Sequence, residues 1–380
     1  MKLFEIVISS HKNAKRIICV NDTHKSAHSI KDSERLFRKS SKPVKNEFIK
    51  SCKPFPSIHE FNNLLSKPEN KIRLQAYLKD EFQKMAQDSN IEIIYTVVGE
   101  YSLNLSTGIP EHWLLCLHAE ADTALFTIYN SIRAAGYINS VILDTEDTDN
   151  YIQAAYVTNK VSGSMLIKQK KEYINDQSLC RQEDIDTIIP LHIMTGSDHT
   201  SAFYGVGKKV VADRVSKSAE ARNLLISCGA SLDLTDEAIA DMSTFVTKYV
   251  YNDKNSITPA AARAAKWRCQ KIKSITRMIP DSESLLHQFK RVNYMVYIQK
   301  NFHLKEHPSP LLHGWNIENG LCLPTRSALP ALPRVMPYQM ELSDDHSDGD
   351  SESYSDIISD EEDFDESCGS DYFSTDSDSD

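Results

Sequence analysis

The chain has 380 residues, a length that suits two or three domains with a sizeable core. Its net charge of −10 is unevenly spread: no Lys or Arg follows residue 334, and 17 of the 53 acidic residues lie beyond it, so residues 1–334 hold 43 basic against 36 acidic side chains, about +7. A basic body with an acidic tail favours polyanions such as nucleic acid, although the same balance also serves solubility alone.

The eight cysteines are scattered without a CxxC pair, which argues against a zinc knuckle and a compact disulfide framework. The sequence shows no signal peptide and no apolar run near 18 residues. We therefore expect an intracellular, soluble protein with reduced thiols and no membrane partner.

Taken in chain order, residues 1–215 alternate strands with helices. The expected elements are a strand at 16–20, a basic helix within 28–38, a helix at 61–86, a strand at 91–98, an amphipathic helix at 119–135 that ends at Gly136, a strand at 140–143 and a hairpin at 164–173. This alternation predicts an α/β domain.

The remainder of the chain changes character twice. Three or more helices are expected within 181–303, which predicts a helical region over 216–305. A Pro-rich extension follows over 306–341. The tail, residues 342–380, is rich in Ser, Asp and Glu and is predicted to be disordered.

Acidic residues recur directly after strands or at helix starts: Asp22, Glu120, Asp122, Asp147, Asp149 and Asp198. Strand ends converge on one edge of an α/β sheet, where ligands bind. Carboxylates gathered there would repel one another unless cations bound, which points to Mg²⁺ or Mn²⁺. Each acid alone has a plainer interpretation: DTEDTD (144–149) is typical of a solvated turn, and Glu120 and Asp122 face one site only in a first helical turn.

The stretch TGSDHTSAFYGVGKK (195–209) joins one of these acids to a glycine turn and two cations. It follows the apolar segment IIPLHIM (188–194). GVGKK is not a P-loop, because Ala202 stands where that motif needs its first glycine.

These motifs, in this order, resemble the flap endonuclease/PIN-like 5′-nuclease superfamily. The carriers are ICVNDTHKSAHSIKDSERLFR (18–38), EADTALFTIYNSIRAAGYINSVILDTEDTD (120–149) and GSDHTSAFYGVGKK (196–209). They are most similar to a transposon-associated animal branch with the patterns SIK…R, HEEADT, DTD, H..TGCDTTSAF.GKGK and PSP…HGW. The counterparts here run from Asp22 to Trp315.

The resemblance implies a PIN-like fold, with a twisted, mainly parallel sheet flanked by helices. It implies that the six acids above are metal ligands and that Lys31, Arg35 and Arg38 stabilise the scissile phosphate. Gly205, Gly207, Lys208 and Lys209 would bind the phosphates of DNA or RNA. Two ions with a water nucleophile would then hydrolyse a phosphodiester. A nucleic-acid partner makes a nuclear location the expectation.

The pattern also departs from that family. Its first metal-binding Asp is missing, because only 21 residues precede Asp22 and none of them is Asp. We therefore expect weakened metal binding, or a sequence that starts too late. Asn150 and Gln153 also replace apolar residues, which costs stability unless they are paired.

Three hypotheses follow from these motifs. The first is a nucleic-acid-binding protein of transposon origin with residual Mg²⁺-dependent nuclease activity. The second is a catalytically inactive DNA-binding or protein-interaction module, whose acidic tail competes for its basic surface or binds basic partners. The third is a chain that does not fold stably.

Overall fold

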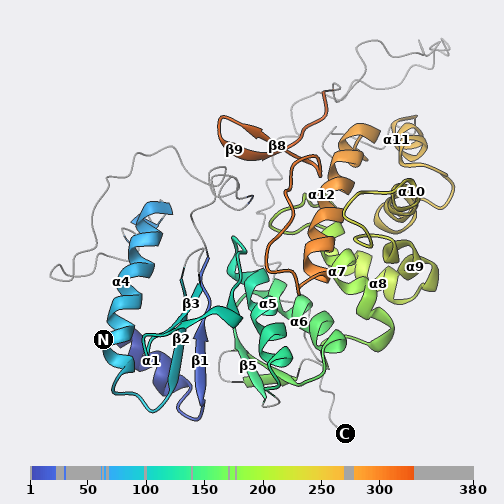
Figure 1. Ribbon diagram of the computed structural model, residues 1–380. Helices are drawn as coiled ribbons and strands as arrows, with labels where there is room; N and C mark the ends of the chain where they lie inside the picture. The colour runs from blue at the N-terminus through green and yellow to red at the C-terminus, as the bar shows by residue number, and fades with distance from the viewer. Residues whose placement is uncertain are drawn as a thin grey trace, which may run out of the picture. The chain divides into compact units, whose positions relative to one another are not determined.

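A computed structural model gives the fold, and Figure 1 shows its elements. The chain divides into two units, Met1–Arg326 and Ser327–Asp380. The structure describes residues 2–22, 30, 61, 64–65, 68–97, 101–137, 140–169, 172–175, 178–268 and 278–328. The predicted basic helix with Lys31, Arg35 and Arg38, and the predicted disordered tail, lie outside these residues.

The first sheet has the order β1-β2-β3-β4 and begins after helix α1 (Lys2–Ser10). Strand β1 (Arg16–Cys19) pairs in parallel with β2 (Glu92–Val97), which pairs antiparallel with β3 (Tyr101–Asn104). Strand β4 (Pro110–Glu111) completes the sheet before the short helix η1 (His112–Leu114). The strands expected at 16–20 and 91–98 are thus confirmed.

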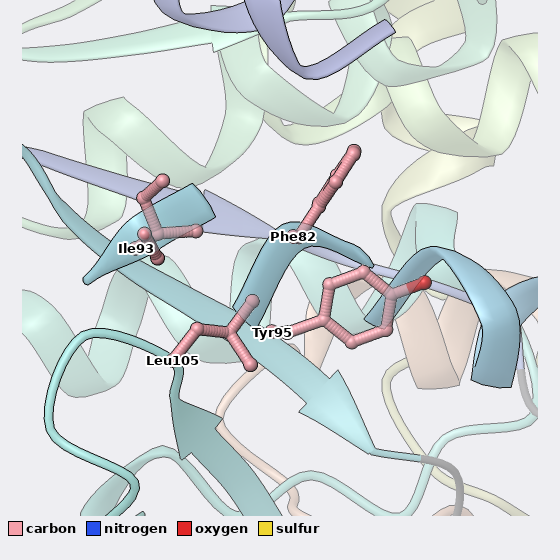
Figure 2. Close-up of a cluster of buried hydrophobic side chains, with 5 residues drawn as sticks. Phe82, Ile93, Tyr95 and Leu105 are labelled. Carbon is pink, nitrogen blue, oxygen red and sulfur yellow. The ribbon is translucent and has the colours of Figure 1, made fainter. Parts of the chain in front are cut away.

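Alternating side chains of β2 build a core on each face of this sheet. Ile93 and Tyr95 pack with Phe82 and Ala86 of helix α4 (Pro68–Ala86) and with Leu105. Figure 2 labels Phe82, Ile93, Tyr95 and Leu105 of this cluster. Phe82 meets Tyr95 edge-on, with ring centroids 6.2 Å apart. Ile94 points to the other face, as the two-residue period of a strand requires, and packs against Leu114 and Ile128.

The second sheet follows helix α5 (Ala121–Ala134). Strand β5 (Val141–Asp144) pairs in parallel with β6 (Met165–Gln169) across helix α6 (Thr148–Lys160), and β7 (Glu172–Asn175) returns antiparallel. The helix expected at 119–135 and the hairpin at 164–173 are confirmed. Gly136 follows α5 with φ +83°, the left-handed conformation expected of a helix-ending glycine.

The rest of the first unit is mainly helical. Its helices are η3 (Gln182–Asp184), α7 (Ile185–Met194), α8 (Lys208–Ser216), α9 (Ala219–Ile226), α10 (Asp236–Phe245), the π-helical turn η4 (Val246–Val250), α11 (Pro259–Arg268) and α12 (Ser282–Lys300). Helix α12 packs against α6, α7 and α10. The apolar segment 188–194 is the buried end of α7. Between residues 216 and 305, the described parts of the chain (216–268 and 278–305) are mainly helical, as the sequence predicted.

Two features differ from the sequence prediction. The described strands form small sheets with only two parallel pairs, β1–β2 and β5–β6, in place of one mainly parallel sheet. Strands joined by only a few residues return antiparallel, because a parallel pair needs a longer crossover. The Pro-rich extension also holds an unpredicted hairpin, β8 (Trp315–Glu318) with β9 (Leu321–Pro324).

The fold class that emerges is a mixed α/β arrangement of helices and small sheets. Among the helices that the structure describes, none combines the length and the apolar character needed to cross a membrane.

Candidate functional site

Asp22 lies directly after β1 and caps a helix that is distant in sequence. Its Oδ1 accepts a hydrogen bond of 2.8 Å from the backbone N–H of Ala121, at the start of α5. Glu120, the N-cap residue of α5, makes no side-chain capping bond. Asp22 therefore supplies an acceptor to a helix N-terminus, where backbone N–H groups otherwise lack partners.

The same helix start brings Glu120 and Asp122 to the site. Helix α5 begins at Ala121, so Glu120 is its N-cap and Asp122 lies in its first turn. The sequence predicted that the two acids face one site only in this placement. Glu120 Oε2 lies 3.1 Å from His199 Nε2, and both side chains are largely buried. His199 thus supplies a partner for one of the predicted metal ligands.

His199 and Asp198 lie in a tight turn that follows α7. Ser197 and Thr200 exchange backbone hydrogen bonds of 3.0 and 3.3 Å across this turn. The Thr200 hydroxyl donates to the carbonyl oxygen of Ile193 over 2.6 Å and fixes the turn to the helix end. These bonds fix the backbone of the turn that carries Asp198 and His199.

Asn150 connects Asp122 to the loop after β5. Its Nδ2 donates to Asp122 Oδ1 over 3.3 Å and to Thr145 Oγ1 over 3.0 Å. The side chain is only 2% exposed. The sequence raised the cost of buried polar residues at Asn150 and Gln153, and these two bonds satisfy the Nδ2 group of Asn150. Asn150 Oδ1 and Gln153 Nε2 are buried without a hydrogen-bond partner, so the cost is only partly offset.

Asp147 begins α6 as its N-cap and accepts a hydrogen bond of 2.9 Å from the backbone N–H of Asp149. Burial raises the pKa of the Asp147 carboxyl, and the negative charges of Asp149, Asp122 and Asp198 raise it further. The charges of these three acids therefore add to the effect of burial in disfavouring the ionised form of Asp147.

Asp149, His192 and Lys208 form a chain of contacts between α6, α7 and α8. His192 Nε2 lies 3.1 Å from Asp149 Oδ1, and Lys208 Nζ lies 3.3 Å from His192 Nδ1. Burial opposes ionisation of Asp149, but the contact with His192 and the charges of His192, Lys208 and His199 outweigh it and lower its pKa. Burial lowers the pKa of the Lys208 ammonium, against the charges of Asp149 and Asp198.

The glycine turn lies beside this chain of contacts. Gly205 has φ +74° and is exposed, and a Cβ added to it or to Gly207 would meet no atom within 4 Å. Gly207 is the N-cap of α8 and offers no side-chain cap. Lys209 is exposed, whereas Lys208 is half-buried. The backbone at the start of α8 is thus open to a ligand on the surface.

Several of the acids that the resemblance assigns as metal ligands contact other groups of the protein in this arrangement. Within the described parts of the chain, no three His, Cys, Asp or Glu side chains are grouped so that they could hold a metal ion. Glu120 and Asp149 contact histidines, and Asp22 and Asp147 accept helix-capping bonds. The predicted ligands are neighbours that mostly bind the protein itself.

Sequence reasoning gave no role to three residues that organise the site: Asn150, His192 and His199. His192 and His199 flank Asp198 within seven residues, and this proximity of imidazoles to a candidate acid was an available signal. Their partners lie 43 and 79 residues upstream, so the pairs themselves could not be read from spacing.

Comparisons with protein-family models, curated proteins and solved structures found no match to this chain.

Proposed function

We propose that this protein binds nucleic acid through the start of α8, on a PIN-like scaffold of transposon origin that cleaves poorly or not at all. The observation that carries the proposal is the contact chain Asp149–His192–Lys208, which holds a half-buried ammonium beside an open glycine turn. The order of motifs that resembles the nuclease superfamily supports the same interpretation of this loop.

The chemistry of the loop suits a phosphate. A helix N-terminus carries partial positive charge, and its N–H groups favour an anion. Gly205 and Gly207 leave room for a phosphate to approach the backbone. Lys208 is fixed by His192, so it loses little conformational freedom on binding, and Lys209 adds an exposed charge.

The experiment is to measure the affinity of the full-length protein for labelled DNA over a range of salt concentrations. Lys208→Ala and Lys209→Ala are compared with Lys84→Ala, whose ammonium pairs with Glu81 on α4. Both loop variants should bind DNA more weakly than wild type. Their affinity should also depend less on salt, because binding releases about one counterion fewer for each phosphate that the variant no longer neutralises. If they bind like the Lys84→Ala control, the loop is not the phosphate site.

A second candidate is a divalent-metal-dependent nuclease. Burial raises the pKa of Asp147 and the charges of Asp149, Asp122 and Asp198 raise it further; the proximity of these carboxylates favours this candidate, because a cation would neutralise their charge. Labelled flap, nicked and single-stranded DNA are incubated with the protein in Mn²⁺ or Mg²⁺, beside Asp147→Ala. Cutting that disappears in the variant would support the nuclease, whereas salt-sensitive binding without cutting would support the binding protein.

A nucleic-acid partner is also the ground for proposing a nuclear location. Imaging of the tagged full-length chain tests it, and an exclusively cytoplasmic signal would favour RNA over nuclear DNA as the partner.

A further inference from the structure

Helix α11 carries basic residues and an exposed tryptophan that the proposed phosphate loop does not use. Between Asp253 and Asp281 the sequence has no acidic residue, and α11 itself contributes Arg263, Lys266 and Arg268. Trp267 is 40% exposed, and the next residue, Arg268, is also exposed. Two consecutive residues of α11 thus present an indole and a guanidinium at the surface.

This helix is linked to the phosphate loop through one aromatic ring. The Lys266 ammonium lies 4.5 Å from the ring centroid of Tyr251. Tyr251 also contacts Phe203: the two rings meet edge-on, with centroids 5.7 Å apart. Phe203 is buried and directly precedes Tyr204, Gly205 and the start of α8. The turn η4 contacts both α8 and α11, which agrees with this link.

The remaining cations of α11 are directed to the protein. The Arg263 guanidinium donates to the carbonyl oxygen of Ile279. Burial lowers the pKa of Lys266, while the charge of Asp253 raises it, and this ammonium packs on Tyr251. Trp267 and Arg268 are thus the parts of α11 that remain available for a partner among the described residues.

We propose that Trp267 and Arg268 bind a single-stranded stretch of nucleic acid next to the phosphate loop, a proposal that rests on the function proposed above. An exposed indole stacks on an unpaired base, whereas the bases of a duplex are already stacked. The adjacent guanidinium pairs with a phosphate. The surface therefore selects substrates in which a single strand continues from the segment bound at α8.

The test compares three labelled probes with the full-length protein: oligo(dT), a blunt duplex, and a duplex with a single-stranded extension. Trp267→Ala should weaken binding of oligo(dT) and of the extended duplex about tenfold, the effect of removing one base-stacking interaction, and leave the blunt duplex unchanged. Tyr173→Ala removes an exposed aromatic from β7 and should change none of the three affinities. Thermal melts check that both variants fold.

Tryptophan fluorescence gives a second readout. Oligo(dT) should quench the emission of the wild-type protein and should lose most of that effect in Trp267→Ala, because Trp315 is buried and Trp113 packs on Tyr137. Equal affinities of Trp267→Ala and wild type for the extended duplex would overturn the proposal, as would an equal loss on all probes.

The two proposals fail in different ways. If Lys209→Ala weakens every probe and Trp267→Ala weakens none, the loop binds phosphate and α11 does not contribute. If Trp267→Ala weakens oligo(dT) while Lys208→Ala and Lys209→Ala do not, α11 binds the strand and the loop assignment is wrong. A wild-type protein that binds none of the three probes overturns both proposals.

Discussion

At the scale of single residues, Asp147 serves two opposed roles. Its carboxylate caps α6, which stabilises the helix, whereas burial and the charges of three other acids destabilise its charged form. Removing the charge alone should therefore have a different effect from removing the whole cap.

We expect Asp147→Asn to raise the free energy of unfolding at pH 7, because Asn keeps the cap and removes the repulsion. The free energy of unfolding of Asp147→Ala should be lower than that of Asp147→Asn by about 1 kcal/mol, the usual contribution of an N-cap. Because the folded-state pKa of Asp147 is raised, the stability of the wild-type protein falls as pH rises through that pKa. In acid Asp147 is protonated, so the difference in unfolding free energy between Asp147→Asn and wild type should vanish there. Urea unfolding at neutral and at acidic pH measures both effects, and an Asn variant less stable than wild type at neutral pH would contradict the repulsion.

Asn150 offers a test of the buried polar bridge. Asn150→Ala removes the donor to Asp122 and to Thr145 and should lower the free energy of unfolding by about 1–3 kcal/mol. Asn159→Ala, on the exposed face of the same helix, also removes one bond to the backbone and should cost much less. Equal destabilisation of the two variants in thermal melts would mean that the bridge contributes no more than a surface hydrogen bond.

At the scale of elements, the segment after α12 is anchored along the start of the α5 region. Leu117 N–H donates to the carbonyl oxygen of Lys305 over 2.7 Å, and His118 Nε2 lies 2.8 Å from the carbonyl oxygen of Leu304. The His118 and His307 rings pack with centroids 3.6 Å apart. Burial lowers the pKa of His118, and burial together with the charge of His118 lowers that of His307 to about 3.

This pair should make the segment sensitive to acid. A histidine whose folded-state pKa is depressed stabilises the fold fully above its unfolded pKa, about 6.5, and loses that contribution as pH falls toward 3. His307→Gln should flatten the decline of melting temperature as pH falls below about 6.5, and the exposed His303→Gln should leave it unchanged. A His307→Gln profile parallel to wild type would show that the packed pair does not control the acid response.

The elements themselves were largely predictable, because strands and helices of the first unit follow local periodicity, as in 91–98 and 119–135. The β8–β9 hairpin was missed because its Pro-rich surroundings hide a short strand pattern. The acids of the site were predictable as neighbours from their positions after strands and at helix starts. Their histidine and asparagine partners were not, because those contacts depend on how α6, α7 and the turn at 197–200 pack.

At the scale of the whole molecule, charge is divided between the two units. The acidic residues beyond position 334 outweigh the surplus of about +7 in the preceding sequence. An acidic segment that reached a basic surface of the same chain would have a high effective concentration there and would compete with nucleic acid.

We expect a full-length variant with the Asp and Glu residues of 342–380 changed to Asn and Gln to bind DNA more tightly at low salt. The difference should shrink as ionic strength rises, because salt screens both interactions. Fluorescence anisotropy at low and at high salt measures it, and an equal number of Ser→Ala changes in the tail is the control. Unchanged affinity at low salt would exclude competition by the tail.

The cap that Asp22 provides to α5 bears on how this sequence can evolve. An acid that caps a helix start beside β1 serves folding by itself, whatever else the residue does. Asn at position 22 would keep the cap but would remove the negative charge. Related proteins that bind no cation at this site should therefore carry either Asp or Asn at position 22. Related proteins that need a cation there should carry Asp alone.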